Sequence, residues 1–275
     1  MSTLEAIKER QRGWAKRQSK QPDRNYLASV SANLYQEMAA STKAAFGDGA
    51  GSELIDTSKS PAKMKALHSS SALAVNFFDY WVNRDSGPLQ QALQMDARID
   101  SILFEKTYST GFSLPHLDVV IEDENKTITA FESKFTEWLT PLGKKEPFRD
   151  AYFENQTKHW ERVGLPECQR LARKMYDAYK SDERNVFQHL DAPQLLKHAL
   201  GLAKNLKTFS LVYIYFAAPG TEADDHRDEI YKFISEVDSR LNFESLTYQK
   251  VFNKLKVNAP DDSDYLDYLE ERYFG

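Results

Sequence analysis

Three ionisable side chains interrupt two short segments that otherwise favour buried β-strand. Asp118 lies within the apolar segment Leu117–Ile121, and Glu132 and Lys134 lie within Ile128–Phe135. An unpaired charge is expensive to bury, so each side chain needs a partner if its strand is central in a sheet. Side chains alternate across a strand, so Glu132 and Lys134, two positions apart, share one face. Two acids and a base on one face could together bind a cation and act on a bound phosphate.

The register of the two segments decides whether the two acids meet. Directly opposed residues of an antiparallel pair share a face, so Asp118 opposes Glu132 if opposed residue numbers add to 250. That register requires the three-residue loop Glu124–Lys126, whereas a sum of 248 leaves the acids as diagonal neighbours and an odd sum separates them. Opposed Cβ atoms lie about 5 Å apart, so both carboxylates could reach one Mg²⁺ ion, whose oxygen ligands lie at about 2.1 Å.

A cation held by two carboxylates can polarise a phosphoryl oxygen and lower the pKa of a bound water. Both effects promote hydrolysis of a phosphodiester. Lys134, one step along the same face, could orient that water or stabilise charge that develops on the phosphate. The alternative is that Glu132 and Lys134 form a solvated strand face and Asp118 an exposed edge. The conjunction of an acid, a short turn and an acid-x-lysine triplet on the next strand favours the chemical interpretation.

The elements around these residues are those of an α/β protein. Apolar spacing and turn residues predict, in chain order, helix over 4–46, a Gly/Ser-rich linker over 47–61, a buried helix over 71–82, strands over 99–108, 117–122 and 127–136, two or three helices over 148–207, a buried strand over 211–216 and further helix over 227–256. The expected fold is therefore a central sheet of about four strands flanked by helices, with an N-terminal helical arm and C-terminal helical additions.

The charge of the chain is polarised along its length. The formal net charge of −5 comes from 36 Lys and Arg against 41 Asp and Glu in 275 residues. Residues 259–275 contain six acids and one arginine, so this segment alone accounts for the whole net charge, and the first 24 residues are basic. Net negative charge argues against a nucleic-acid binder only if it is evenly spread. The acidic tail either mimics nucleic acid, repels it or is simply solvated, and charged terminal segments are usually solvated.

The remaining composition predicts a soluble, cytoplasmic, globular protein. The lone Cys168 permits no intrachain disulfide, suits a reducing compartment, and is expected to be a small buried hydrophobe. The N-terminus has no apolar stretch of the kind found in secretory signals, and the longest apolar run, Phe209–Pro219, is shorter than the roughly 20 residues that span a bilayer. The motifs of zinc proteases, α/β-hydrolases, P-loop enzymes and dinucleotide-binding enzymes do not occur in the sequence.

The segments Pro115–Asp118 and Phe131–Lys134 resemble the PD-(D/E)XK nuclease superfamily, which has the restriction-endonuclease-like fold. The helix that begins at His68 and the strand segment Phe104–Glu105 also resemble a little-described bacterial group of restriction-endonuclease-like proteins. The resemblance covers residues 67–219. It implies a mixed central sheet and activity as a nuclease.

The resemblance also implies a role for each site residue. Asp118 and Glu132 would bind the metal, with Glu105 as an earlier acid, and the main-chain carbonyl of Ser133 would assist. Lys134 would be the catalytic lysine. One departure from the superfamily pattern is that its proline usually precedes the aspartate directly, whereas here Pro115 lies three positions earlier.

The helix that follows the catalytic strand contains a second departure. Some relatives carry Gln-x-x-x-Tyr there, whereas Gln156 is followed at that spacing by Trp160. Gln156 is thus either an active-site residue or a surface polar residue, and Trp160 is expected in the core. The nearby side chains His116 and Glu122 are expected to be a loop histidine and a solvated acid. Five basic residues nearby either contact phosphates or form a solvated helix face: Lys144, Lys145, Arg149, Lys158 and Arg162.

The residues and the resemblance together predict a Mg²⁺-dependent DNA endonuclease, a hydrolase of phosphodiester bonds for which Mn²⁺ can substitute. A role in restriction or defence is in keeping with the family, and a homodimer is plausible because cutting both strands needs two active sites or two visits. The alternative is a catalytically silent module that binds nucleic acid or protein. The expected division is a helical arm with linker over 1–60, a nuclease-like domain with a helical insertion over 61–258 and an acidic tail over 259–275.

Overall fold

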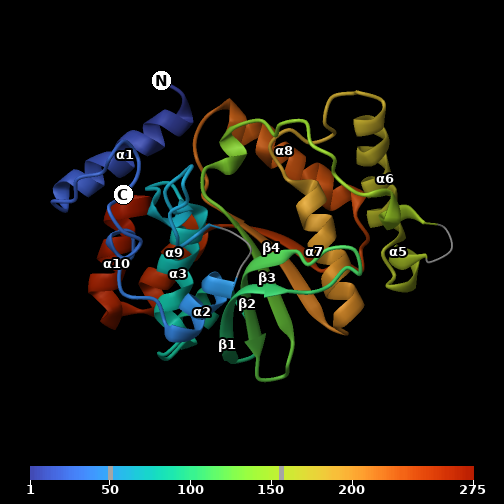
Figure 1. Cartoon of the computed structure of the whole chain (residues 1–275). Helices are drawn as coiled ribbons and strands as arrows, with labels where there is room; N and C mark the ends of the chain where they lie inside the picture. The colour runs from blue at the N-terminus through green and yellow to red at the C-terminus, as the bar shows by residue number, and fades with distance from the viewer. Residues whose placement is uncertain (49–51, 155–157) are drawn as a thin grey trace.

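Five β-strands form one mixed sheet with helices on both faces in the computed structural model, which describes residues 1–48, 52–154 and 158–275 (Figure 1). The strands lie side by side in chain order: β1 (Ile99–Thr107), β2 (His116–Asp123), β3 (Ile128–Lys134), β4 (Phe209–Tyr215) and β5 (Phe243–Thr247). Strands β1, β2 and β3 are antiparallel to one another, whereas β3, β4 and β5 are parallel. The central strand is therefore β3, which carries Glu132 and Lys134.

The hairpin between β2 and β3 has the predicted register. Val119 opposes Phe131, and every pair of this ladder has residue numbers that add to 250. The connecting loop is Glu124–Lys126, and the Asp123 carboxylate accepts the backbone N–H groups two and four residues further on, at 2.9 and 2.8 Å. Lys126 adopts a left-handed φ of 62°, which closes the turn. Local hydrogen bonds thus fix the conformation of the turn, and the length of the turn fixes the register of β2 and β3.

Ten α-helices occur in the described part of the chain: α1 (Thr3–Arg17), α2 (Ala40–Asp48), α3 (Ser70–Phe78), α4 (Gly87–Leu93), α5 (His159–Arg162), α6 (Pro166–Lys180), α7 (Ala192–Asn205), α8 (Thr221–Glu236), α9 (Tyr248–Asn258) and α10 (Ser263–Leu269). The predicted buried helix is α3, and the Ser69 side chain caps it by accepting the Ala72 N–H at 3.2 Å. No described helix is both long enough and apolar enough to traverse a lipid bilayer.

The two faces of the sheet pack into two separate hydrophobic cores. Val119 and Phe131 face the core that contains α3, α9 and α10, whereas Val120 and Ala130 face the core that contains α6, α7 and α8 (Figure 1). Side chains alternate along β2 and β3, so the even-numbered positions 118, 132 and 134 lie on the same face as Val120 and Ala130. The candidate catalytic side chains therefore lie beneath α7.

The prediction of about four strands is one strand short. Strand β5 lies inside the stretch 227–256 that apolar spacing predicts as helix, between the end of α8 and the start of α9. Its five residues are too few to reveal a period of two, and their conformation depends on pairing with β4, in which Leu211 pairs with Phe243 and Tyr215 with Thr247. The extended conformation of such a short strand depends on pairing with the neighbouring strand and not on its own sequence.

The prediction of helix over 4–46 is only partly confirmed. Helices α1 and α2 occupy its two ends, but most of the chain between Arg17 and Ala40 is irregular and contains an antiparallel bridge between Asp23 and Tyr26. Ser19 and Arg24 adopt left-handed backbone angles, both with a φ of 56°, which interrupt the helix.

The acidic C-terminal segment is packed against the protein instead of extending into solvent. Tyr265, Leu269 and Tyr273 are almost fully buried, and the Gln11 side chain of α1 donates to the Arg272 main-chain carbonyl at 2.6 Å. Figure 1 shows both chain ends on the same side of the sheet, with α1 beside α10. The expectation of solvated ends is therefore wrong for the apolar side chains of this segment, because tyrosines and leucines at helical spacing bury between its acidic residues.

Candidate active site

The sheet brings three acids from adjacent strands into one row. Phe104 pairs with Val119 and Lys106 pairs with Leu117, so Glu105 lies opposite Asp118. The register of the β2–β3 hairpin then places Asp118 opposite Glu132. Glu105 has a left-handed φ of 52° in the middle of β1. This conformation is uncommon for a residue with a side chain, and such residues cluster at functional sites.

Glu132 and Lys134 form a buried ion pair that is completed by two side chains of α7. Glu132 is 1% exposed, and one of its carboxylate oxygens accepts a hydrogen bond from the Lys134 ammonium. Its other oxygen accepts from His198 Nε2 at 2.9 Å, and Lys134 also donates to Gln194 Oε1 at 3.3 Å. A buried pair needs such further hydrogen bonds to compensate for lost solvation. Helix α7 supplies these bonds from above the sheet.

Asp118 is held by the backbone of the neighbouring strand. Its Oδ2 accepts the Ser133 N–H at 2.7 Å, just beyond the last paired residues of the hairpin. The Ser133 side chain lies on the opposite face and hydrogen-bonds Tyr248 Oη of α9 at 2.7 Å. The strand that carries Lys134 is therefore tied on one face to α7 and on the other to α9, which limits movement of the site.

The electrostatics of the site separate the acids into two kinds. Burial raises the pKa of Asp118 well above its usual range, the charge of Glu132 raises it further, and Lys134 only partly opposes these effects. Burial, Glu53 and Glu132 likewise raise the pKa of Glu105 to about 7. Burial alone would also raise the pKa of Glu132, but Lys134 and His198 outweigh it and lower the pKa to about 2.

Lys134 is kept charged despite its surroundings. Burial would lower the pKa of its ammonium, but Glu132 and Asp118 raise the pKa well above the ordinary value. Glu132 and Lys134 are thus an ionised pair, whereas Asp118 and Glu105 lack enough positive charge nearby to ionise easily. A cation placed between the acids would remove this deficit.

The donor chemistry of the site fits a hard divalent cation. Carboxylate oxygens are the ligands that Mg²⁺ takes, and Mg²⁺ usually keeps several waters while using only one or two protein carboxylates. Across residues 1–48, 52–154 and 158–275, no three His, Cys, Asp or Glu side chains converge as a metal-binding group. Asp118 and Glu132 are therefore the pair whose chemistry and register fit Mg²⁺, with Glu105 next in the row.

The sequence alone does not point to the two α7 residues that contact the site, Gln194 and His198. Gln194 and His198 are one helical turn apart, beside the apolar positions Leu195 and Ala199, and the Asp191 side chain caps the helix by accepting the Gln194 N–H at 3.0 Å. The available signal was a polar pair at i and i+4 in a helix with an otherwise apolar face. Nothing in the sequence indicates which strand that pair contacts.

The other candidates have varied positions. Gln156 lies outside the described residues, whereas Trp160 is fully buried as expected and donates to the Tyr152 carbonyl at 3.1 Å. The expectation of a loop histidine is wrong for His116, which is the first residue of β2 because it pairs with Thr107 of β1. Its Nδ1 lies 3.3 Å from Glu105 Oε2 at the edge of the site. Glu122 is solvated as expected and pairs with Lys126 of the turn at 2.9 Å.

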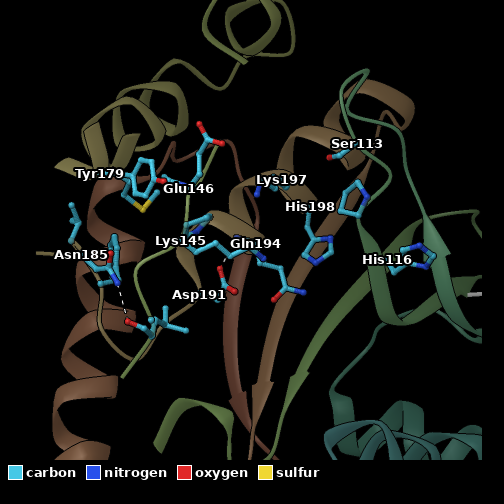
Figure 2. Close-up of a pocket in the computed structure, with 18 of the residues that line it drawn as sticks. Ser113, His116, Lys145, Glu146, Tyr179, Asn185, Asp191, Gln194, Lys197 and His198 are labelled. Carbon is cyan, nitrogen blue, oxygen red and sulfur yellow. Dashed lines mark hydrogen bonds between the residues drawn. The ribbon is translucent and has the colours of Figure 1, made fainter. Parts of the chain in front are cut away.

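The five basic residues that follow β3 are not a single surface. Lys158 pairs with Glu161 at 3.0 Å, and Lys144 pairs with Asp182. Lys145 instead lines a cavity that Gln194 and His198 also line (Figure 2). Cys168 is fully buried as expected, and burial raises the pKa of its thiol to about 12, so it is not a nucleophile.

The cavity beside the catalytic residues has a volume of about 460 Å³. It lies between the start of α7, the end of α6 and the loops that precede β2 and follow β3 (Figure 2). Gln194 and His198 line this cavity and also contact Lys134 and Glu132. The cavity and the catalytic centre therefore share a wall.

Comparison with known proteins identifies a family for this chain. The model of the family REase-ARP, described as a restriction endonuclease associating with ARP, matches residues 5–274. Neither the curated proteins nor the solved structures include a significant match. The family match spans both packed ends as well as the sheet and the acidic row, and the chain belongs to this restriction endonuclease family.

Proposed function

We propose that this chain is a metal-dependent DNA endonuclease of the PD-(D/E)XK type that hydrolyses phosphodiester bonds. The observation that carries the proposal is the shared sheet face of Asp118, Glu132 and Lys134, in a chain that belongs to a restriction endonuclease family. Asp118, Glu132 and Glu105 would hold Mg²⁺, for which Mn²⁺ can substitute. The bound cation would polarise a phosphoryl oxygen and lower the pKa of a water molecule.

The acids, the lysine and the two α7 residues of the site have different roles in this proposed reaction. Asp118 would release its proton when its carboxylate binds a cation, because positive charge favours the ionised form. Lys134 stays charged and can donate hydrogen bonds to an oxygen of the reacting phosphate. Gln194 and His198 orient Lys134 and Glu132 respectively, and are positioning residues.

The proposal extends to the partners of the enzyme. DNA is the substrate that the restriction endonuclease family favours, and the description of the family adds association with ARP. We extend that association to this chain, together with a restriction or defence role. Cleavage of both DNA strands would require two copies of the chain or two successive binding events.

The decisive experiment compares cleavage by two site variants and two matched controls. Plasmid, single-stranded DNA and RNA are incubated with the wild type, Asp118→Ala and Lys134→Ala, in Mg²⁺, in Mn²⁺ or with a chelator. The controls are Asp100→Ala and Lys126→Ala, an exposed acid and lysine that pair with each other at 2.6 Å at the far end of the same strands. Thermal melting checks that all four variants fold.

Removal of either site residue should slow cleavage by a factor of about 10² or more, whereas the controls should stay within about twofold of the wild type. A chelator should abolish cleavage. The proposal fails if no nucleic acid is cut in either metal, or if cleavage survives both site substitutions. In that case a fold that binds DNA without cutting it would account for the family match.

A further inference from the structure

The cavity that shares a wall with the catalytic centre has no part in the chemistry described above. Its residues come from four separate segments: the loop before β2, the loop after β3, residues 175–187 and the first turns of α7. Figure 2 shows polar side chains from these segments around one space, with His116 on one side, Tyr179 and Asn185 on the other and Gln194 and His198 between them. Its volume of about 460 Å³ lies within the range of about 300–1,000 Å³ that is typical of small-molecule sites.

The walls of the cavity suit a flat, largely apolar group. Apolar side chains line it on several sides and include Leu114, Pro115, Val186, Phe187 and Pro193. Stacking against such walls is the usual way in which proteins hold a base that has left its stack. An inorganic anion would gain nothing from these apolar contacts.

The polar groups of the cavity suit the edge of a base. Gln194 Oε1 accepts from Lys134, so the amide nitrogen is the end that remains to donate elsewhere. His198 is 1% exposed, its Nε2 is bonded to Glu132, and its Nδ1 has no hydrogen-bond partner within the described parts of the chain. A buried polar atom without a partner is costly, and a ligand that approached this wall could relieve the cost. Donors and acceptors beside apolar walls are the features that recognise nucleobases.

Charged side chains of both signs line the same cavity: two lysines, and the two acids Glu146 and Asp191. Lys145 and Lys197 both line it, and the Lys197 ammonium lies 5.1 Å from the centre of the Phe148 ring. Burial lowers the pKa of Lys197, so an anion beside it would stabilise its charged form. The cavity thus combines apolar walls, a hydrogen-bonding edge and two lysines beside two acids.

We propose that this cavity binds one unstacked nucleotide of the substrate strand, with its base between the apolar walls and a phosphate toward Lys145 and Lys197. This inference rests on the proposed function, since the neighbouring phosphate would be the one near Lys134. Gln194 and His198 line the cavity and also hydrogen-bond Lys134 and Glu132 respectively. A base in the cavity would therefore affect the orientation of Lys134 and Glu132.

Gly143 offers a way to block the cavity without touching the catalytic residues. It lines the cavity, and a Cβ added at this position would meet no atom within 4 Å. Gly143→Trp therefore adds a large side chain at the cavity wall without a backbone clash and is the blocking variant, and Gly143→Ala is the matched control. If Gly143→Trp does not fold, Leu114→Trp at the rim, where the native side chain is 61% exposed, replaces it.

The test measures binding separately from cleavage. The four deoxynucleoside monophosphates and inorganic phosphate are titrated into the wild type and both variants without divalent cation. DNA that carries 2-aminopurine near the cleavage position then reports unstacking by an increase in fluorescence. At least one mononucleotide should bind the wild type and Gly143→Ala equally and Gly143→Trp at least about tenfold more weakly, and only the first two proteins should increase the fluorescence.

Three results would overturn the inference: no mononucleotide binds, Gly143→Trp binds as well as the wild type, or inorganic phosphate competes on equal terms. If the wild type cuts DNA while no mononucleotide binds, this inference fails and the proposed function stands. If mononucleotides bind in the cavity while no nucleic acid is cut, the proposed function fails and the nucleotide site stands.

Discussion

Each acid of the site has a different kind of neighbour, and burial together with the surrounding charges decides how readily it ionises. Glu132 has an ammonium and an imidazole, Asp118 has one backbone N–H, and Glu105 has the nearby His116. Glu132 is therefore ionised without a metal, whereas Asp118 and Glu105 would ionise more readily beside a cation. This arrangement couples metal binding to the protonation of Asp118 and Glu105.

Glu105→Gln should stabilise the metal-free protein at high pH. Folding raises the pKa of Glu105 from 4.5 to about 7, so the ionised carboxylate costs stability as pH rises above 4.5, and the full cost is reached above pH 7. The variant should therefore gain about 1–3 kcal/mol in free energy of unfolding at pH 8 and little at pH 4.5. Urea denaturation at the two pH values measures this. A loss of stability in Glu105→Gln at pH 8 would contradict the conclusion that the Glu105 carboxylate is costly to ionise. Glu124→Gln in the exposed turn is the control.

Substitution of the α7 pair should impair activity without removing a group that touches the phosphate. Gln194→Ala removes the acceptor for Lys134, and His198→Ala removes the donor to Glu132. Each should cost about 10- to 100-fold in cleavage rate or metal affinity, as is usual for partners of metal ligands. Gln194→Glu keeps an acceptor and should retain more activity than Gln194→Ala. If the concentration of Mg²⁺ for half-maximal cleavage does not rise in His198→Ala, then His198 does not position Glu132.

At the scale of elements, β3 joins the two halves of the protein. Its even-numbered residues form the site beneath α7, and its odd-numbered residues Phe131 and Ser133 face α3 and α9. Strand β3 also changes the sheet from antiparallel to parallel, since it pairs with β2 on one side and β4 on the other. Strand β3 is therefore supported by two strands in the sheet and by helices on both of its faces.

Helix α8 contains a buried histidine that packs against β4 and should make stability depend on pH. His226 is fully buried, hydrogen-bonds Tyr213 Oη at 2.9 Å and stacks on Trp138 at 4.5 Å between ring centres. Burial lowers its pKa from 6.5 to about 3. Below pH 6.5 this histidine is protonated in the unfolded chain, whereas in the folded protein it stays neutral until about pH 3. The free energy of unfolding therefore falls as pH falls through this range.

The contribution of His226 to this loss should be about 1.4 kcal/mol per pH unit between pH 6 and 3. His226→Gln removes the titrating ring and should flatten the dependence of unfolding free energy on pH by that amount, even if it lowers stability at pH 7. Urea denaturation of both proteins from pH 7 to pH 4.5 measures the two slopes. Parallel slopes would show that His226 is protonated as easily in the folded protein as in the unfolded chain.

At the scale of the whole molecule, the two charged ends are structural. Arg272 is 1% exposed, donates to the Asn33 main-chain carbonyl and to Tyr268 Oη at 2.5 Å each, and also to the Asn33 side-chain oxygen. The guanidinium also lies 4.4 Å from the centre of the Trp14 ring of α1. The last residues of the chain thus hold the N-terminal segment against the core.

Arg272→Met should lower the free energy of unfolding by about 2–4 kcal/mol, because it leaves buried oxygens without their charged donor. Arg170→Met, at a side chain that is 72% exposed, should change it by less than about 0.5 kcal/mol. Urea denaturation compares the two. Deletion of residues 259–275 should likewise destabilise the fold, so a change in DNA affinity on deletion would not isolate the effect of charge. Equal stabilities of the two arginine variants would refute the structural role of Arg272.

The features that the sequence alone determined about this protein are local. Alternation along a strand and the length of a tight turn decided that Asp118, Glu132 and Lys134 share a face, because both depend on residues within about 16 positions of one another. Helix α3 with its serine cap and the burial of Trp160 were predictable for the same reason.

Only the tertiary structure decided which distant residues complete the site. Gln194 and His198 lie 60 and 66 positions after the side chains that they contact. Strand β5 pairs with residues 32 positions earlier in β4, and Arg272 contacts Asn33 across 239 positions. Contacts of this kind depend on how a helix packs on a sheet, which no pattern within one segment specifies. The physical reason is that local sequence sets which face a side chain occupies, whereas the global packing of apolar surface sets what that face meets.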